Sequence, residues 1–146
     1  MHAASPRQMI LAVLGGLGLV LSACSGMLGP GDSRAGLSCI DDSPECVEQR
    51  DVTLKSMLAD KNRSWVTETA TPHAHASGVR LFAFRSKKAE LTCEELAHAR
   101  KEAEGAPKVL KGAQGLSPAQ ISRASMFAAE VNRELVAEMK KRRCRA

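Results

Sequence analysis

The sequence predicts a mainly α-helical fold: a small, disulfide-stapled domain over residues 37–146 that ends in an antiparallel helical hairpin. Helix-capping patterns precede three segments, and apolar residues recur at three- and four-residue steps near the C-terminus. Four cysteines fall in this region, and a domain so small often needs covalent support. At most one short strand or extended segment is expected, over Val79–Arg85, where apolar and aromatic residues cluster.

The first helix is expected to begin at Ser-Pro-Glu, residues 43–45, and to run to about Asp60. Serine is a favoured N-cap, proline suits the first helical position, and an acid stabilises the first turn. Val47, Leu54 and Leu58 are expected to lie near one buried face. Residues 61–78, which are rich in threonine, alanine and histidine, are interpreted as an irregular connector.

Two capping boxes mark the helices of the C-terminal hairpin. Thr92 with Glu95 forms the first box, and Ser117 with Gln120 forms the second. The turn between the two helices contains two glycines. Because the turn is short, the helices should pack against each other in antiparallel orientation.

Each hairpin helix carries an apolar stripe. The stripe of the first helix comprises Leu96, Ala99, Ala103 and Leu110. The stripe of the second, which is expected to run to about Arg142, comprises Ile121, Ala124, Ala128, Val131, Leu135 and Met139, with Phe127 at its edge. Pro107 interrupts the first pattern, so a kink or a break is expected there.

The cysteines Cys39, Cys46, Cys93 and Cys144 allow three pairings. We favour Cys39–Cys46, which would fix the entry to the first helix, and Cys93–Cys144, which would close the open end of the hairpin. On an ideal helix Cys144 points away from the apolar stripe, so the last turn must unwind or curl. The six residues between Cys39 and Cys46 match neither the usual zinc spacing nor a redox Cys-x-x-Cys motif.

Residues 1–23 have the features of a secretory signal peptide. Arg7 is the one positive side chain before an apolar run over residues 9–20. A membrane span needs roughly 20 residues, so this run is too short for a retained transmembrane helix. Residues 24–36 then read as a flexible tether, because glycine, proline and small polar residues dominate them.

The signal ends in Leu21-Ser22-Ala23-Cys24, which resembles the lipobox of bacterial lipoproteins. The resemblance implies cleavage before Cys24, a thioether-linked diacylglycerol on its sulfur and an acyl chain on its new amine. Two or three chains would hold the protein on the membrane, since each buried methylene contributes about 0.8 kcal/mol. In the enteric lipoproteins that this segment resembles, an aspartate at the next position tends to retain the protein in the inner membrane. Ser25 therefore favours the outer membrane, and the domain would face the periplasm. The alternative is an ordinary secreted protein with an unmodified Cys24.

Composition narrows the function classes. The formal net charge is +5, but aromatic residues make up only 3% of the chain, which argues against a face of stacked rings for nucleic acid or sugar. The strongest charge feature is a basic C-terminal cluster of Lys140, Lys141, Arg142, Arg143 and Arg145. These cations either offset the helix dipole and solubilise the helix end, or contact anionic lipid, cell-wall polymer or an acidic protein face.

The histidines offer the only candidates for a metal or catalytic site. His73 and His75 form a His-x-His pair, which we interpret as an exposed loop because no carboxylate or cysteine stands at a suitable local spacing. His98 is interpreted as a solvated helix pair with Glu94, four residues earlier. No hydrolase elbow, zinc-protease motif, Walker loop or haem-attachment motif occurs. No metal or cofactor is therefore expected.

These observations predict a lipid-anchored envelope protein whose domain is a noncatalytic interaction or assembly module. Its expected partners are membrane lipid, through acylated Cys24, and another envelope protein. The first alternative is binding of cell-wall polymer or anionic lipid through the basic C-terminal cluster. The second is a small periplasmic enzyme that would collect the histidines with acidic residues in a concave site. Nucleic acid is not an expected partner.

Overall fold

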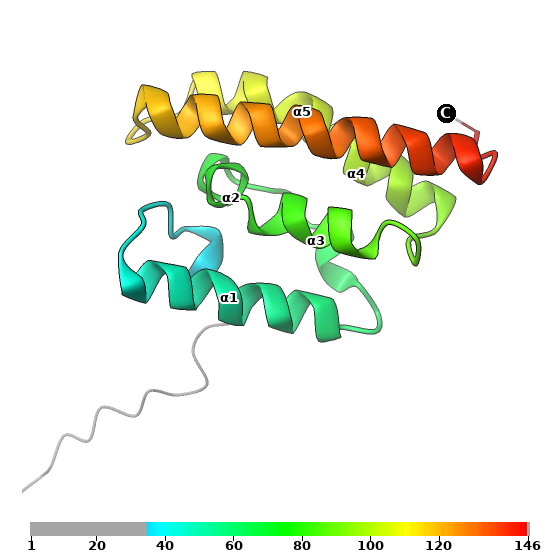
Figure 1. The fold of residues 1–146 in the computed structure, drawn as a ribbon, viewed down its shortest axis with the longest axis horizontal. Coiled ribbons are helices and arrows are strands. Elements are labelled where there is room, and N and C mark those ends of the chain that lie inside the picture. Colours follow the sequence, from blue (N-terminus) through cyan, green and yellow to red (C-terminus); the bar gives the residue numbers. More distant parts are fainter. Residues whose placement is uncertain (1–34, 146) are drawn as a thin grey trace, which may run out of the picture.

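The computed structural model describes residues 35–145, and every regular element in this range is a helix (Figure 1). The elements are η1 (Ala35–Leu37), α1 (Pro44–Ala59), η2 (Ser64–Thr67), α2 (Pro72–Ser77), α3 (Val79–Lys87), α4 (Cys93–Lys111) and α5 (Pro118–Lys141). They form three layers: the α4–α5 hairpin, the α2–α3 pair and α1 (Figure 1). The signal peptide, Cys24 and most of the tether lie outside the described residues. Among the described helices, none combines the length and apolar character needed to span a membrane.

The three predicted helix starts are confirmed. Ser43 caps α1 by accepting a hydrogen bond from the backbone of its first turn, 3.3 Å away. In α4, the Thr92 hydroxyl accepts from the Glu95 amide at 3.1 Å, and the Glu95 carboxylate accepts from the Thr92 amide at 2.6 Å. Ser117 and Gln120 make the same reciprocal pair at the start of α5. Each cap satisfies amides that have no partner within the helix.

The predicted hairpin is also confirmed, and its two stripes form the centre of the core. Every member of the α4 stripe is at most 1% exposed. The α5 stripe is buried from Ala124 to Met139, while Ile121 is half-buried. α4 and α5 pack along each other, and the alanines let the two helix axes approach closely.

Pro107 does not interrupt α4, which continues to Lys111, so the expected break does not occur. Proline removes one amide from the helix and crowds the preceding turn. Its neighbours in the stripe, Ala103, Ala106 and Leu110, are buried on both sides of it. Packing against the facing helix therefore holds α4 together across the position where propensity alone predicts a break.

The expected strand over Val79–Arg85 is wrong, because these residues form most of α3. The backbone begins the helix at once, with the Phe82 amide donating to the Gly78 carbonyl at 2.9 Å. A lone strand would have no partner for its backbone groups, whereas a helix satisfies them internally. α3 lies between α1 and α5 and buries Leu81 and Phe84 completely.

Residues 61–78 are more regular than the expected connector. They contain η2, which buries Trp65 and Val66, and α2, which is capped by the Thr71 hydroxyl. Gly78 then ends α2 in the left-handed conformation, with φ 74°, and α3 starts at the next residue. Glycine tolerates this conformation without the steric penalty of a side chain, so it separates two helices that would otherwise be continuous.

The buried face of α1 differs from the expected one. Cys46, Thr53 and Met57 are buried, whereas Val47 is 49% exposed. η1 packs against α1 and covers Thr53, whose hydroxyl accepts a hydrogen bond from the Gly36 amide at 3.0 Å. Gly36 is buried so tightly that a Cβ there would lie 2.5 Å from the Gln49 carbonyl oxygen.

Both favoured disulfides are present: Cys39–Cys46 and Cys93–Cys144. The second requires the expected curl at the end of α5. The helix ends at Lys141, and Arg143 takes a left-handed conformation with φ 55°. The Cys144 amide then bonds back to the Met139 carbonyl at 2.9 Å, which carries the cysteine round to the start of α4.

Candidate functional site

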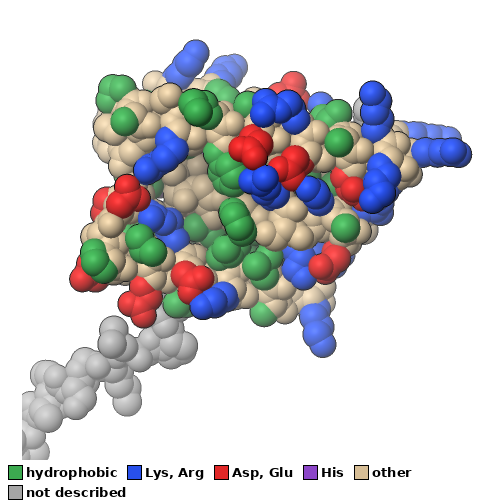
Figure 2. All heavy atoms as spheres, in the orientation of Figure 1, with side chains coloured by type: hydrophobic (Ala, Val, Ile, Leu, Met, Phe, Trp, Pro, Cys, Tyr) green, Lys and Arg blue, Asp and Glu red, His purple; other side chains and the backbone are tan. Residues whose placement is uncertain are grey.

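An open groove lies between α1, α3 and α5, with a cavity volume of about 600 Å³. α1 forms one wall, α5 forms the other, and the junction of α2 and α3 forms the floor. Its apolar lining consists of Val47, Leu54, Ala76, Val79, Phe82, Ala124 and Phe127. In Figure 2, apolar side chains gather between the edges formed by α1 and α5. The groove contains no histidine.

Local structure at the floor explains why the groove stays open. α3 lies between α1 and α5, and it packs against both of them. The Phe127 ring rests on the α2–α3 junction, where a Cβ at Gly78 would be 3.6 Å from it. The short α2–α3 junction therefore contacts the Phe127 ring on one side, while the ring also lines the open groove.

Two large apolar side chains of the groove are exposed on facing elements. Phe82 on α3 is 45% exposed and Val47 on α1 is 49% exposed. The other apolar residues of the lining are half-buried or buried, so Phe82 and Val47 extend one apolar surface rather than standing alone. Contiguous exposed apolar surface bordered by charge is a common feature of binding sites.

Two arginines and one carboxylate stand at one end of the groove. Asp42 accepts from Arg50 at 3.4 Å and from Arg123 at 3.3 Å. Arg50 is fixed by the backbone, because it also donates to the carbonyls of Cys39 and Asp41. Arg123 and Asp42 have side chains that are 58% and 71% exposed. Counting the neighbouring Asp41, whose carboxylate interacts with the Arg50 charge, this end carries as many negative as positive charges, and the Asp42–Arg123 pair is accessible to water.

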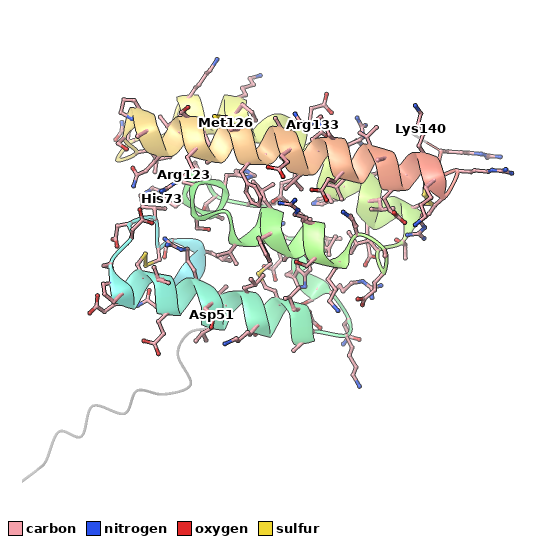
Figure 3. The ribbon with its side chains drawn as sticks, viewed as in Figure 1. Asp51, His73, Arg123, Met126, Arg133 and Lys140 are labelled. Atoms are coloured by element: carbon pink, nitrogen blue, oxygen red, sulfur yellow. A yellow bond between two sulfur atoms is a disulfide. The ribbon has the colours of Figure 1, made fainter. Side chains whose placement is uncertain are left out.

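The two walls carry opposite charge. Asp51 projects from α1 and Arg123 from α5, on opposite sides of the groove (Figure 3). The difference extends beyond the groove, since residues 41–60 contain six carboxylates against Arg50 and Lys55. Acidic side chains gather where α1 begins, whereas Lys and Arg gather where α5 ends (Figure 2). A ligand that spans the groove meets an acidic wall and a basic wall.

The basic C-terminal cluster lies together at the end of α5, and all five of its side chains are exposed. Arg142 donates to the Leu91 carbonyl, and Lys141 lies 3.6 Å from Glu138. From Arg123 to Arg143 the chain advances about 30 Å along α5, at the usual rise of an α-helix. The cluster is therefore separate from the groove, and the Cys93–Cys144 disulfide fixes it to the start of α4.

A buried ion pair joins α3 to α4 and to the segment that contains η2. Arg80 on α3 is 1% exposed and binds both carboxylate oxygens of Glu102 on α4. Its remaining donors reach the carbonyls of Trp65 and Glu68, at 2.7 Å and 2.9 Å. Its guanidinium also lies 5.5 Å from the centre of the Phe84 ring. Every strong interaction of Arg80 is internal, which is the pattern of a structural group.

The histidines lie elsewhere and do not form the expected arrangement. His75 is not in an exposed loop: α2 places it in the core at 4% exposure, where its Nδ1 has no hydrogen-bond partner among the described residues. Residues two positions apart on a helix point to nearly opposite sides, so His73 and His75 cannot share a metal ion. The pKa of His75 lies below its ordinary value, chiefly because burial disfavours the charged imidazolium. The nearby Glu102 charge raises this pKa and the Arg80 charge lowers it, but both effects are smaller than that of burial.

His98 also has a different neighbour from the expected one. Its Nε2 is 3.9 Å from a carboxylate oxygen of Glu102, one turn after it, and its side chain is 41% exposed. Both carboxylate oxygens of Glu102 already accept hydrogen bonds from Arg80. Within residues 35–145, no group of three or more histidine, cysteine or acidic side chains is placed to bind a metal ion.

Sequence reasoning missed the groove, although it singled out some of the residues in it. Val47 was assigned to a buried face, Phe82 to a strand and Phe127 to the edge of a stripe. Arg123 and Asp42 are 81 positions apart, and no local pattern connects them. The one available signal was the surplus of large apolar residues on α1 and α3 beyond those that a single buried face needs.

The groove and the basic C-terminal cluster are the two surface features from which a function can be argued. The residues of these two sites and their charges define the chemistry that each can offer. No protein-family model, curated protein or solved structure matches this chain.

Proposed function

We propose that the protein is a lipid-anchored protein of a bacterial envelope whose folded domain binds another envelope protein and has no catalytic role. The lipobox-like Leu21-Ser22-Ala23-Cys24 supports the anchor. The two disulfides support export, because such bonds persist in oxidising compartments. An anchor would keep the domain close to membrane-bound partners and raise its effective concentration there.

The groove between α1, α3 and α5 is the observation that carries the binding role. Phe82 and Val47 leave about half of their surface in water. Burying such a side chain fully contributes roughly 1.5–3 kcal/mol, so a partner that covers both gains binding energy that the isolated domain does not use. The other apolar residues of the lining are already held in place by the core: Leu54, Ala76, Val79, Ala124 and Phe127.

The best occupant is an amphipathic helix of the partner protein. Such a helix places apolar anchors every three or four residues along a groove. It also carries charged side chains along both edges, which suits one wall with Asp51 and another with Arg123. A lipid acyl chain would fill the apolar floor but would leave both charged walls without complementary groups.

Site-specific photocrosslinking in intact cells tests this proposal. A photoreactive amino acid at Phe82 should crosslink to one identifiable envelope protein. The same amino acid at Val109 is the matched control, because Val109 is 40% exposed on α4 and lies outside the groove. Equal crosslinking from both positions, or none from Phe82, would contradict a binding role for the groove.

The basic C-terminal cluster supports a second candidate function, the binding of an anionic cell-wall polymer. η1, the described element nearest in sequence to Cys24, lies beside the middle of α1, and Figure 1 shows the end of α5 on the opposite side of the domain. This separation favours a ligand that faces away from the anchoring membrane over the headgroups of that membrane. Several cations held at one end attract a polyanion and lose that attraction in salt.

Cosedimentation with purified cell wall tests the second function. Binding should fall with added salt and should be lost when Lys140, Lys141, Arg142 and Arg143 are neutralised together. Neutralising Lys108 and Lys111, which lie at the opposite end of the hairpin, is the control. Cosedimentation with anionic vesicles but not with wall would contradict the polymer and indicate lipid instead.

A further inference from the structure

We propose that the groove selects partner helices that carry a carboxylate next to their apolar anchor residues. In the unbound protein, Asp42 occupies the position at Arg123 that this partner carboxylate would take. The inference rests on the proposed protein-binding role of the groove and specifies the chemistry of the partner. Arg123 is the residue that recognises the carboxylate, and Asp42 is an internal competitor for it.

The geometry at the end of the groove supports this exchange. Arg123 and Arg50 converge on one carboxylate: Arg123 donates to Oδ2 of Asp42 at 3.3 Å and Arg50 donates to Oδ1 at 3.4 Å. Arginine prefers two parallel hydrogen bonds to a carboxylate, and Arg123 makes only one to Asp42. A second carboxylate at this end would therefore find donors that Asp42 leaves unsatisfied.

The competitor can leave without loosening the domain. Exposed ion pairs contribute little to stability, and Asp42 is 71% exposed. The segment that carries it is held by other bonds: the Gln120 side chain donates to the Ile40 carbonyl at 3.1 Å, and Arg50 donates to two backbone carbonyls. Asp42 is thus free to exchange while its backbone stays in place.

The position of Arg123 makes the recognition directional. Both Arg123 and Phe127, one helical turn later, line the groove. A bound helix whose apolar residues contact Phe127 and Phe82 must then place its carboxylate about one turn towards the Asp42 end. The reverse arrangement is disfavoured because both arginines of the lining, Arg50 and Arg123, stand at the Asp42 end, so the partner carboxylate would have no arginine at the other end.

A displayed library of random peptides of about 15 residues, the length at which isolated helices begin to form, is the probe. The library is selected on the full chain in detergent micelles, with the Phe82→Glu variant used to remove peptides that bind elsewhere. Enriched peptides should combine apolar residues at helical spacing with Asp or Glu. Selection on Arg123→Glu should replace these acids with Lys or Arg.

Dissociation constants of one enriched peptide then separate recognition from general attraction. Asp42→Asn should tighten binding by up to about fivefold, the range of an exposed ion pair, and Arg123→Glu should weaken it by at least as much. Arg133→Glu is the matched control: it makes the same charge change on the same helix, at an exposed residue outside the groove. Unchanged emission of Trp65 verifies that each variant is folded.

Two results would overturn the inference in distinguishable ways. Peptides that bind in a Phe82-dependent manner without a preference for Asp or Glu would refute recognition of a carboxylate by Arg123. So would an Arg133→Glu variant that weakens binding as much as Arg123→Glu. In both cases the binding role of the groove would stand. If no peptide binds in a Phe82-dependent manner, the proposed role of the groove fails with it.

Discussion

Replacing Arg80 with methionine is expected to destabilise the domain by about 3–5 kcal/mol, the usual effect of removing one partner of a buried ion pair. The structure explains why the value should be this large. Glu102, whose side chain is 8% exposed, would lose both bonds to its carboxylate. The carbonyls of Trp65 and Glu68 would lose the donors that now reach them. Small domains are stable by only about 5–15 kcal/mol, so the loss is a large part of the total.

Urea unfolding followed by the emission of Trp65 measures this change. Trp65 is the one tryptophan of the chain, is 5% exposed and receives one of the Arg80 bonds on its own carbonyl. A second variant, Arg80→Met with Glu102→Leu, leaves no buried charge at this place. It should be more stable than Arg80→Met alone, because an apolar pair often replaces a buried ion pair with little loss.

Two outcomes would refute the reasoning about Arg80. A loss below about 1 kcal/mol for Arg80→Met would mean that water or a rearranged side chain satisfies Glu102. A double variant that is less stable than Arg80→Met would mean that the carboxylate has partners other than Arg80. Either result would contradict the role of the ion pair as the link between α3 and α4.

Three further predictions concern stability. Replacing Cys93 and Cys144 with serine should destabilise the domain by about 4 kcal/mol, and removing the other bridge by only about 2.4, because the loops span 51 and 7 positions; equal urea midpoints would contradict this. The pKa of His75 is below its ordinary 6.5, so stability should be complete above that pH and fall beneath it. His75→Leu should flatten this slope. Pro107→Ala should add roughly 1–3 kcal/mol, and an unchanged midpoint would count against it.

The helix starts and the disulfides were predictable because their signals are local. The caps at Ser43, Thr92 and Ser117 depend on side chains within three residues of the amides that they satisfy. The hairpin follows from two stripes and a short turn. Once the hairpin is assigned, Cys93 at the start of α4 and Cys144 just after α5 lie together at its open end, which favours a bridge between them.

The rest depended on contacts between distant residues. The run that starts at Val79 has strand propensity, but α3 is a helix because it lies between two other helices and no strand is available to pair with it. His75 looked polar and exposed, yet it is buried beneath the layer that contains Glu102. The groove arises because α3 separates α1 from α5, and no pattern within one segment encodes that distance.

The two disulfides also determine how the domain would respond to mechanical load. A force applied between the N-terminal chain and residue 145 passes through Cys39–Cys46 and then through Cys93–Cys144. These covalent shortcuts bypass residues 40–45 and 94–143, so α5 and nearly all of α4 carry no tension. Beyond η1, only residues 47–92 can be drawn out, to a length of about 160 Å. A pull on the chain would thus unravel α1, α2 and α3 and leave the helical hairpin shielded.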